Sequence, residues 1–231
     1  MTIPPGIIKT ARTLSYYSQL EDVTANNLAN VSTDAFKADR VTALLTTPGG
    51  SPVPVQQIDL SQGTFRETGR VLDVALDGPG FLVVGTAAGE RLTRGGALHL
   101  SGNGTLVDMN GDPVLGAKGP ITISGGTVEL QGDGTVAVDN VAVDRLRLVA
   151  SPGAARLSKE GGGRFVSSTP AAVADPSVLR VRQGAIEESN LDPIHGMVDL
   201  VTIQRAYSAN ISALRALDGV LGTVANDLAK P

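Results

Sequence analysis

Residues 71–84 read VLDVALDGPGFLVV, two short apolar runs separated by an Asp-Gly-Pro-Gly turn. Apolar runs of roughly 4–8 residues that are bounded by glycine, proline or aspartate are typical of β-strands. The same pattern of short apolar runs separated by turn residues continues from Gly63 to Arg182, which predicts an all-β domain. Other strands are predicted at residues 135–138 and 145–149. Other turns are predicted at residues 102–104, 110–112 and 132–134.

The composition fits a chain that buries a core with few aromatic side chains. Of the 231 residues, 42% are apolar and 3% aromatic, so Val, Leu, Ile and Ala must form that core. The formal net charge is −4 and no run of Lys or Arg occurs, which argues against a nucleic-acid partner. The chain has no cysteine, so disulfides and thiolate chemistry are excluded.

On the N-terminal side of this region, residues 3–31 predict one amphipathic helix. Pro4 and Pro5 are compatible with its first turn. Apolar residues then recur at helical spacing, and neither glycine nor proline intervenes between Ile7 and Phe36.

The last segment, residues 193–228, carries a heptad pattern. Its apolar residues alternate at spacings of three and four, which is the a/d pattern of a coiled coil. Asn210 interrupts this seam, and a polar residue in such a position can fix register or the number of partners. The seam consists of Leu200, Ile203, Tyr207, Asn210, Leu214, Leu217, Leu221, Val224 and Leu228.

The predicted fold class is therefore mainly β, with a central β-rich domain flanked by long N- and C-terminal α-helices that pair in a coiled-coil-like layer. Residues 46–56 contain Pro-Gly-Gly-Ser-Pro and read as a linker. The proposed domains are an N-terminal polymerisation helix over 1–36, a linker or extension over 37–62, the β-rich domain over 63–183 and a C-terminal coiled-coil helix over 184–231.

The two apolar stripes must be buried, either on each other, on the β domain or on other copies of the chain. Exposed apolar stripes mark interaction sites, which favours assembly between chains. A two-helix hairpin folded onto its own β domain is an equally compatible arrangement.

No apolar run approaches the ~18 residues that a membrane-spanning helix needs, so no membrane insertion is expected. Residues 1–12 do not read as a cleavable secretory signal. The chain is expected either to stay in the cytoplasm or to leave by a route that needs no such signal.

One spacing imitates a calcium loop. Asp108, Asn110 and Asp112 stand at positions one, three and five, but Pro113 replaces the glycine at position six and Gly119 the glutamate at position twelve. This stretch is predicted to be a hairpin turn.

No other residues form a catalytic, cofactor-binding or metal-binding constellation. His99 is expected on a strand and His195 in the first turn of the last helix, too far apart in sequence to suggest a metal site. Glu187 and Glu188 are expected to cap the approach to a helix or to face solvent. The chain is therefore predicted not to be an enzyme.

Residues 24–37 read TANNLANVSTDAFK, which resembles the N-terminal signature of the flagellar rod and hook proteins. That signature is usually A-N-N-L-A-N, a few residues, and then T-x-G-F-K. Ala35 stands where the family usually has glycine, so the turn after the helix is expected to be less permissive.

Further resemblance covers essentially the whole chain. Residues 68–81 are similar to the opening of the family's central domain, and residues 184–192 and 197–207 to its C-terminal signature. The stretch 92–107 is similar to the family's Y-T-R-x-G-x-F and G-x-L-V segments, with leucine in place of the usual tyrosine and phenylalanine.

This resemblance implies an axial structural subunit that needs no cofactor. Such proteins are exported by the flagellar type III apparatus, without a cleaved signal. Their terminal helices pack with other copies and with neighbouring rod and hook subunits, and their β-rich domain forms an outer layer. The implied location is the periplasmic rod of the flagellar basal body, across the inner membrane. The short chain looks closest to the proximal-rod branch of the family, with the distal-rod branch next.

The assembly interface is predicted to combine the heptad seam with residues of the N-terminal signature. Asparagine is a poor helix former, and its amide can bind a neighbouring backbone or helix instead. Asparagines that simply end the helix are the alternative interpretation. The residues assigned to the interface in the signature are Asn26, Asn27, Leu28, Asn30 and Phe36.

Three other functions stay open at this point. One is a secreted β-domain binding module whose helices form a closed homo-oligomer. A flagellar hook-type subunit is another, although hook proteins are usually much longer. The third is an enzyme whose site has no recognisable motif.

Overall fold

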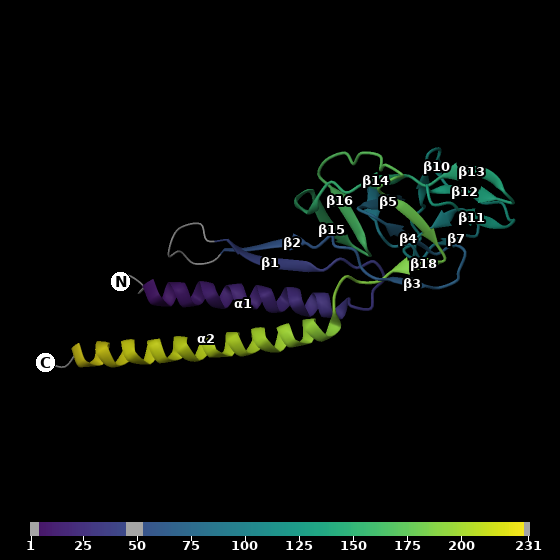
Figure 1. The fold of residues 1–231 in the computed structure, drawn as a ribbon. Coiled ribbons are helices and arrows are strands. Elements are labelled where there is room, and N and C mark those ends of the chain that lie inside the picture. Colours follow the sequence, from purple (N-terminus) through teal and green to yellow (C-terminus); the bar gives the residue numbers. More distant parts are fainter. Residues whose placement is uncertain (1–4, 45–52, 229–231) are drawn as a thin grey trace. The chain divides into compact units, whose positions relative to one another are not determined.

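The computed structural model describes residues 5–44 and 53–228 (Figure 1). The chain divides into two compact units, which are described separately. The helical unit lies within residues 1–29, 39–57 and 192–231, and the β unit comprises residues 30–38 and 58–191.

The helical unit contains both predicted helices. They are α1 (Pro5–Ala29) and α2 (Pro193–Leu228), close to the bounds expected from periodicity. The two helices lie side by side and run in opposite directions (Figure 1). Gln204 on α2 donates a hydrogen bond to Glu21 on α1, with 3.0 Å between Nε2 and Oε1. Within residues 5–44 and 53–228, none of the helices contains an apolar stretch that could span a bilayer.

The extension predicted over residues 37–62 contains regular structure. The strands β1 (Asp39–Leu44) and β2 (Val53–Ile58) pair with each other, and β1 contacts α1. The linker prediction for residues 53–56 was therefore wrong, because this stretch belongs to β2. The rest of that predicted linker, residues 46–52, lies outside the described residues.

Asp192 caps the N-terminus of α2. Its Oδ1 accepts hydrogen bonds from the backbone N–H groups of Ile194 and His195, at 2.8 and 3.2 Å. The side chain of His195, in the first turn as predicted, also contacts the carboxylate, and these bonds lower the pKa of Asp192. The ionised Asp192 therefore stabilises the folded chain at pH values above the ordinary pKa of a carboxyl group. This contribution is lost as the pH falls through the lowered pKa.

The β unit is built from short antiparallel strands, as the sequence predicts. Its largest sheet has five strands in the order β14-β5-β6-β16-β15, and a second sheet has the order β11-β12-β13. The other strands form the pairs β10-β9, β17-β4, β18-β3 and β7-β8. The strands are β3 (Phe65–Glu67), β4 (Val74–Asp77), β5 (Gly80–Thr86), β6 (Gly89–Thr93), β7 (His99–Leu100), β8 (Leu106–Val107), β9 (Leu115–Gly116), β10 (Gly119–Pro120), β11 (Val128–Leu130), β12 (Thr135–Val138), β13 (Val141–Arg145), β14 (Leu148–Ala150), β15 (Leu157–Gly161), β16 (Arg164–Ser167), β17 (Arg180–Gln183) and β18 (Ala185–Glu187).

Both ends of the β unit meet through strand pairing. β3 and β4 come first in this unit, and they pair with β18 and β17, which come last. The unit is thus closed by contacts between residues more than 100 positions apart, and its fold cannot be completed until both ends are present.

The turn in residues 71–84 connects two different sheets. It leads from β4, which pairs with β17, to β5 in the five-stranded sheet. Gly78 in this turn has φ +115°, and a Cβ atom there would lie 2.1 Å from the backbone oxygen of Val178. Only glycine fits this close backbone approach.

Strand β5 is buried on both faces, which explains its continuous apolar run. Leu82 and Val84 point into the larger core cluster, while Phe81 and Val83 belong to a second cluster. Phe81 packs there against Phe165, with 5.4 Å between ring centroids. The remaining members of the second cluster are Leu92, Val149 and Leu157.

The strand predicted over residues 145–149 is interrupted. β13 ends at Arg145 and β14 begins at Leu148, and the two strands belong to different sheets. Between them, the N–H groups of Leu146 and Arg147 bind the carbonyls of Gly134 and Leu115. The prediction joined the end of β13 to β14, because the alternation of side chains alone does not show where the chain changes its strand partners.

Ala35 adopts the left-handed conformation, with φ +57°, and is buried. Its N–H donates to the carbonyl of Glu187 at 2.7 Å, so the surrounding contacts hold this conformation. A side chain with a Cβ atom is strained there, and glycine is not. The expectation that alanine makes this turn less permissive thus has a structural basis.

Replacing Ala35 by glycine should raise the free energy of unfolding by about 1 kcal/mol, because the left-handed strain disappears. Urea denaturation followed by circular dichroism measures the change. Ala38→Gly is the matched control, since Ala38 is buried but not left-handed and its replacement should be destabilising. A loss of stability in Ala35→Gly would contradict the assignment of strain to this position.

Candidate functional site

The heptad seam of α2 is covered unevenly. Ile203 is buried, and Leu200, Tyr207, Asn210 and Leu214 are half-buried. Farther along, Leu217 is 42% exposed. The side chains of the last three predicted seam residues, Leu221, Val224 and Leu228, lie outside the described residues.

Asn210 uses its side chain within its own helix. Its Nδ2 donates to the carbonyl of Ala206 at 2.8 Å, one turn earlier. The role in register or partner number predicted for Asn210 stays a prediction.

A second apolar stripe on α2 is exposed and was not predicted. Ile194, Met197, Val198 and Val201 are spaced three and four residues apart, so they share one face of the helix. Their exposed fractions lie between 48% and 72%. The spacing was visible in the sequence, but the heptad pattern of the seam was assigned instead. We call these four residues the outer stripe.

The asparagines of the N-terminal signature have different environments. Asn26 is exposed and Asn30 half-buried, whereas Asn27 is buried. Asn27 binds the backbone of Asp39 twice, because its Nδ2 donates to the carbonyl at 2.8 Å and its Oδ1 accepts from the N–H at 2.9 Å. The amide of Asn27 thereby fixes the start of β1 against α1.

The two apolar interface residues of the signature are half-buried. Leu28 lies in the last turns of α1. Phe36 belongs to the β unit, where the ammonium of Lys159 lies 4.5 Å from its ring centroid. Their role in contacts with other chains stays a prediction.

The main polar feature of the β unit is a buried cluster of three charged side chains. Lys37 and Glu187 are fully buried, and the side chain of Arg94 is 4% exposed. Each residue comes from a different one of the sequence motifs that resemble the flagellar proteins. We call Lys37, Arg94 and Glu187 the charged cluster.

The carboxylate of Glu187 lies between the two cations. Its Oε1 accepts from Lys37 Nζ at 2.6 Å and from the N–H of Gly63 at 2.9 Å. Its Oε2 accepts from Arg94 Nε at 2.7 Å. Burial lowers the pKa of Lys37, and the hydrogen bond to Glu187 opposes this effect.

The cations also bind backbone carbonyls. Lys37 Nζ donates to Ser61 at 2.6 Å. The guanidinium of Arg94 donates to Leu76, Gly78 and Gly80 at 2.7–2.9 Å, so it holds the turn between β4 and β5. No buried side-chain nitrogen or oxygen among the described residues lacks a hydrogen-bond partner.

The prediction that Glu187 and Glu188 cap a helix or face solvent was wrong for Glu187. Glu188 is partly exposed and accepts bonds from Thr64 and Arg66. Glu187 is buried because two cations distant in sequence compensate its charge.

The calcium-like spacing forms the predicted turn. The carboxylate of Asp108 accepts bonds from the N–H groups of Asn110 and Asp112 and from the side chain of Asn110. Asp112 pairs with Arg164. Within the described residues, no group of three or more His, Asp and Glu side chains could hold a metal ion.

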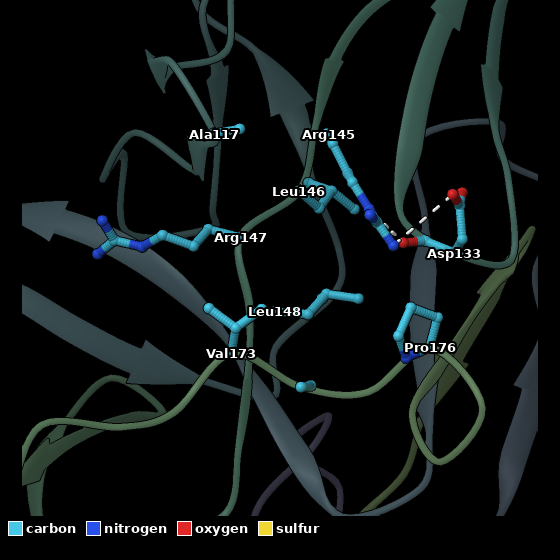
Figure 2. Close-up of a pocket in the computed structure, with 9 residues that line it drawn as sticks. Ala117, Asp133, Arg145, Leu146, Arg147, Leu148, Val173 and Pro176 are labelled. Carbon is cyan, nitrogen blue, oxygen red and sulfur yellow. Dashed lines mark hydrogen bonds and ion pairs between the residues drawn. The ribbon is translucent and has the colours of Figure 1, made fainter.

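An open hollow of about 380 Å³ lies beside β13 and β14 (Figure 2). Its charged residues are Asp133, Arg145 and Arg147. Arg145 donates to the carbonyl of Asp133 at 3.0 Å and pairs with its carboxylate, while Arg147 extends in another direction (Figure 2). The rest of the lining is apolar, and the hollow presents no arrangement of nucleophile and base.

Comparison with known proteins connects these features to flagella. A family model described as "Flagellar hook protein FlgE/F/G D1 domain" matches residues 75–138. Another, described as "Flagellar basal body rod FlgEFG protein C-terminal", matches residues 182–228. The first match lies in the β unit, and the second runs from β17 through α2.

Full-length relatives extend the similarity. The flagellar basal-body rod protein FlgF of Caulobacter vibrioides is 32% identical over 203 residues, which cover 81% of this chain and 83% of that protein. FlgF of Escherichia coli is 33% identical, with 87% and 88% covered. FlgG of Agrobacterium fabrum is 30% identical, with 90% and 93% covered.

Asn27→Ala should remove the protection of the Asp39 amide from hydrogen exchange, because that N–H loses its acceptor. Loss of one hydrogen bond of this kind should lower the free energy of unfolding by about 0.5–1.5 kcal/mol. Nuclear magnetic resonance can follow this single amide. Asn26→Ala is the matched control at an exposed neighbour and should leave the Asp39 amide protected. Equal exchange in the two variants would contradict the assigned role.

Arg94→Met should lower the free energy of unfolding by about 3–5 kcal/mol, because it leaves a buried carboxylate with one cation fewer. Three backbone carbonyls lose their donor as well. Arg66→Met is the control, since Arg66 is half exposed and its ion pairs should contribute about 0–1 kcal/mol. Urea denaturation compares both with the parent chain, and similar losses would refute the importance of the charged cluster.

Proposed function

The chain belongs to the flagellar basal-body rod protein family, and we propose that it is a structural, non-enzymatic subunit of the rod in the flagellar basal body. The observation that carries this proposal is the similarity to FlgF proteins over more than four fifths of both chains. Two family models that match separate parts of the chain support the same function.

The FlgF type is favoured within this family. FlgF relatives share 30–33% identity with the chain, and FlgG relatives share 28–30%. The coverage of FlgF proteins along most of their length also argues against a much longer hook-type subunit. We therefore propose the proximal rod as the place of this subunit.

The proposed mechanism of assembly is polymerisation through the terminal helices. A long helix depends on packing against neighbours more than on its intrinsic propensity. Two sets of apolar side chains on α2 are available for such packing, the outer stripe and the exposed end of the seam at Leu217. We propose that the seam pairs in a coiled-coil-like layer with α1 and with helices of other copies or of neighbouring rod and hook subunits.

The functional division that follows is the one proposed from the sequence. Residues 1–36 and 184–231 serve polymerisation, residues 37–62 form an extension, and residues 63–183 form the outer β-rich layer. We also propose that the chain is exported by the flagellar type III apparatus. A closed homo-oligomer built on the same helices is the alternative that an assembly experiment must separate from an open polymer.

Removal of residues 200–228 should abolish assembly of the purified chain, because it deletes the seam. Leu217→Asp should weaken assembly strongly without unfolding the subunit, since Leu217 is already exposed. Val141→Asp is the matched control, because Val141 is 67% exposed on a strand of the β unit.

Analytical ultracentrifugation over a range of concentrations and electron microscopy measure this assembly. An open polymer should lengthen as the concentration rises. A species of one fixed size at all concentrations would favour the closed oligomer, and normal assembly of the truncated chain would refute the proposed function.

A further inference from the structure

Two segments that are about 150 residues apart lie against each other in the β unit. The first is residues 30–38, which follow α1, and the second is residues 184–191, which precede α2. The N–H of Ala35 donates to the carbonyl of Glu187 at 2.7 Å, and the N–H of Asn190 donates to the carbonyl of Phe36 at 3.3 Å. We call residues 30–38 and 184–191 the paired segments.

A side chain reinforces this backbone contact. Asn190 Oδ1 accepts from the N–H of Ala38 at 2.8 Å, and its Nδ2 donates to the carbonyl of Asp59 at 2.9 Å. The carbonyl of Ala38 in turn accepts from the N–H of Asp59. Each of the paired segments thus completes hydrogen bonds of the other.

The charges decide how strongly the two segments depend on each other. Lys37 in the first segment and Glu187 in the second are both fully buried, and their side chains meet at 2.6 Å. If the first segment left its site, Glu187 would lose a cation while still buried. If the second left, Lys37 and Arg94 would both remain buried without a carboxylate. Either situation is costly, because a buried charge needs a partner.

We infer that the paired segments dock and undock as one cooperative unit, with the Glu187 carboxylate as the group that couples them. The connections of both terminal helices to the β unit are therefore held together or released together. This device acts within a single chain, so it does not rest on the proposed function.

Hydrogen exchange of the full-length variants at single amides tests this inference. In Lys37→Met, the amide of Glu188 should exchange at least tenfold faster, although it donates to Thr64 and makes no bond to the first segment. In Glu187→Gln, the amide of Asp59, which binds the carbonyl of Ala38, should accelerate to a similar extent.

Two controls separate local coupling from general unfolding. Glu188→Gln changes the adjacent, partly exposed carboxylate and should leave the Asp59 amide unchanged. Amides of the buried strand β5 should remain protected in all three variants. Acceleration confined to the segment that carries the substitution would overturn the inference.

The parent chain provides a test that needs no substitution. This test decides whether the paired segments are coupled even if a variant also loses protection in β5. In low concentrations of denaturant, amides of one cooperative unit open with the same free energy and the same denaturant dependence. The amide of Asp59, which binds the first segment at the carbonyl of Ala38, and the amide of Glu188 in the second segment should therefore merge into one opening reaction. Two separate opening reactions would refute the coupling.

Discussion

The β unit depends on the burial of one carboxylate between two cations. Glu187, Lys37 and Arg94 could each be exposed at little cost, but inside the protein each requires the others. Their burial is favourable only when all three side chains and the carbonyls around them are in place. The charged cluster therefore ties the start, the middle and the end of the β unit to a single arrangement, as the pairing of β3 with β18 and of β4 with β17 does for the backbone.

The helical unit is organised in another way. Its described side chains are mostly half-buried or exposed, and only a few, such as Val23 and Asn27, are removed from solvent. Polar contacts such as those of Asn27 with Asp39 define where β1 lies on α1, while the apolar surface of α2 is only partly used. A core of this kind is specific but small. It is compatible with the proposed assembly, in which other chains cover the remaining apolar surface of the helices.

The sequence predicted the features that depend on local pattern. Helix bounds followed from apolar spacing and the β texture from short runs and turns, because both are periodicities within a few residues. It could not predict that Glu187 is buried, since its compensating cations are 93 and 150 residues away. The break between β13 and β14 was missed for the same reason, as it reflects a change of sheet partners. The outer stripe was missed for a different reason. Its spacing of three and four residues is present in the sequence, but α2 was interpreted only through the more regular heptad seam.

The signatures that resemble the flagellar proteins contribute heavily to the internal architecture of the chain. Lys37 and Ala35 belong to the N-terminal signature, Arg94 to the central one and Glu187 to the C-terminal one, and every one of them is buried. Asn27 is also buried, with both ends of its amide bound to its own chain. Side chains occupied in this way build the subunit, so contacts with neighbouring chains must rely chiefly on the surface that remains. On α2 we propose that this surface comprises the outer stripe and the exposed Leu217 of the seam, where substitutions should alter assembly without disturbing the charged cluster.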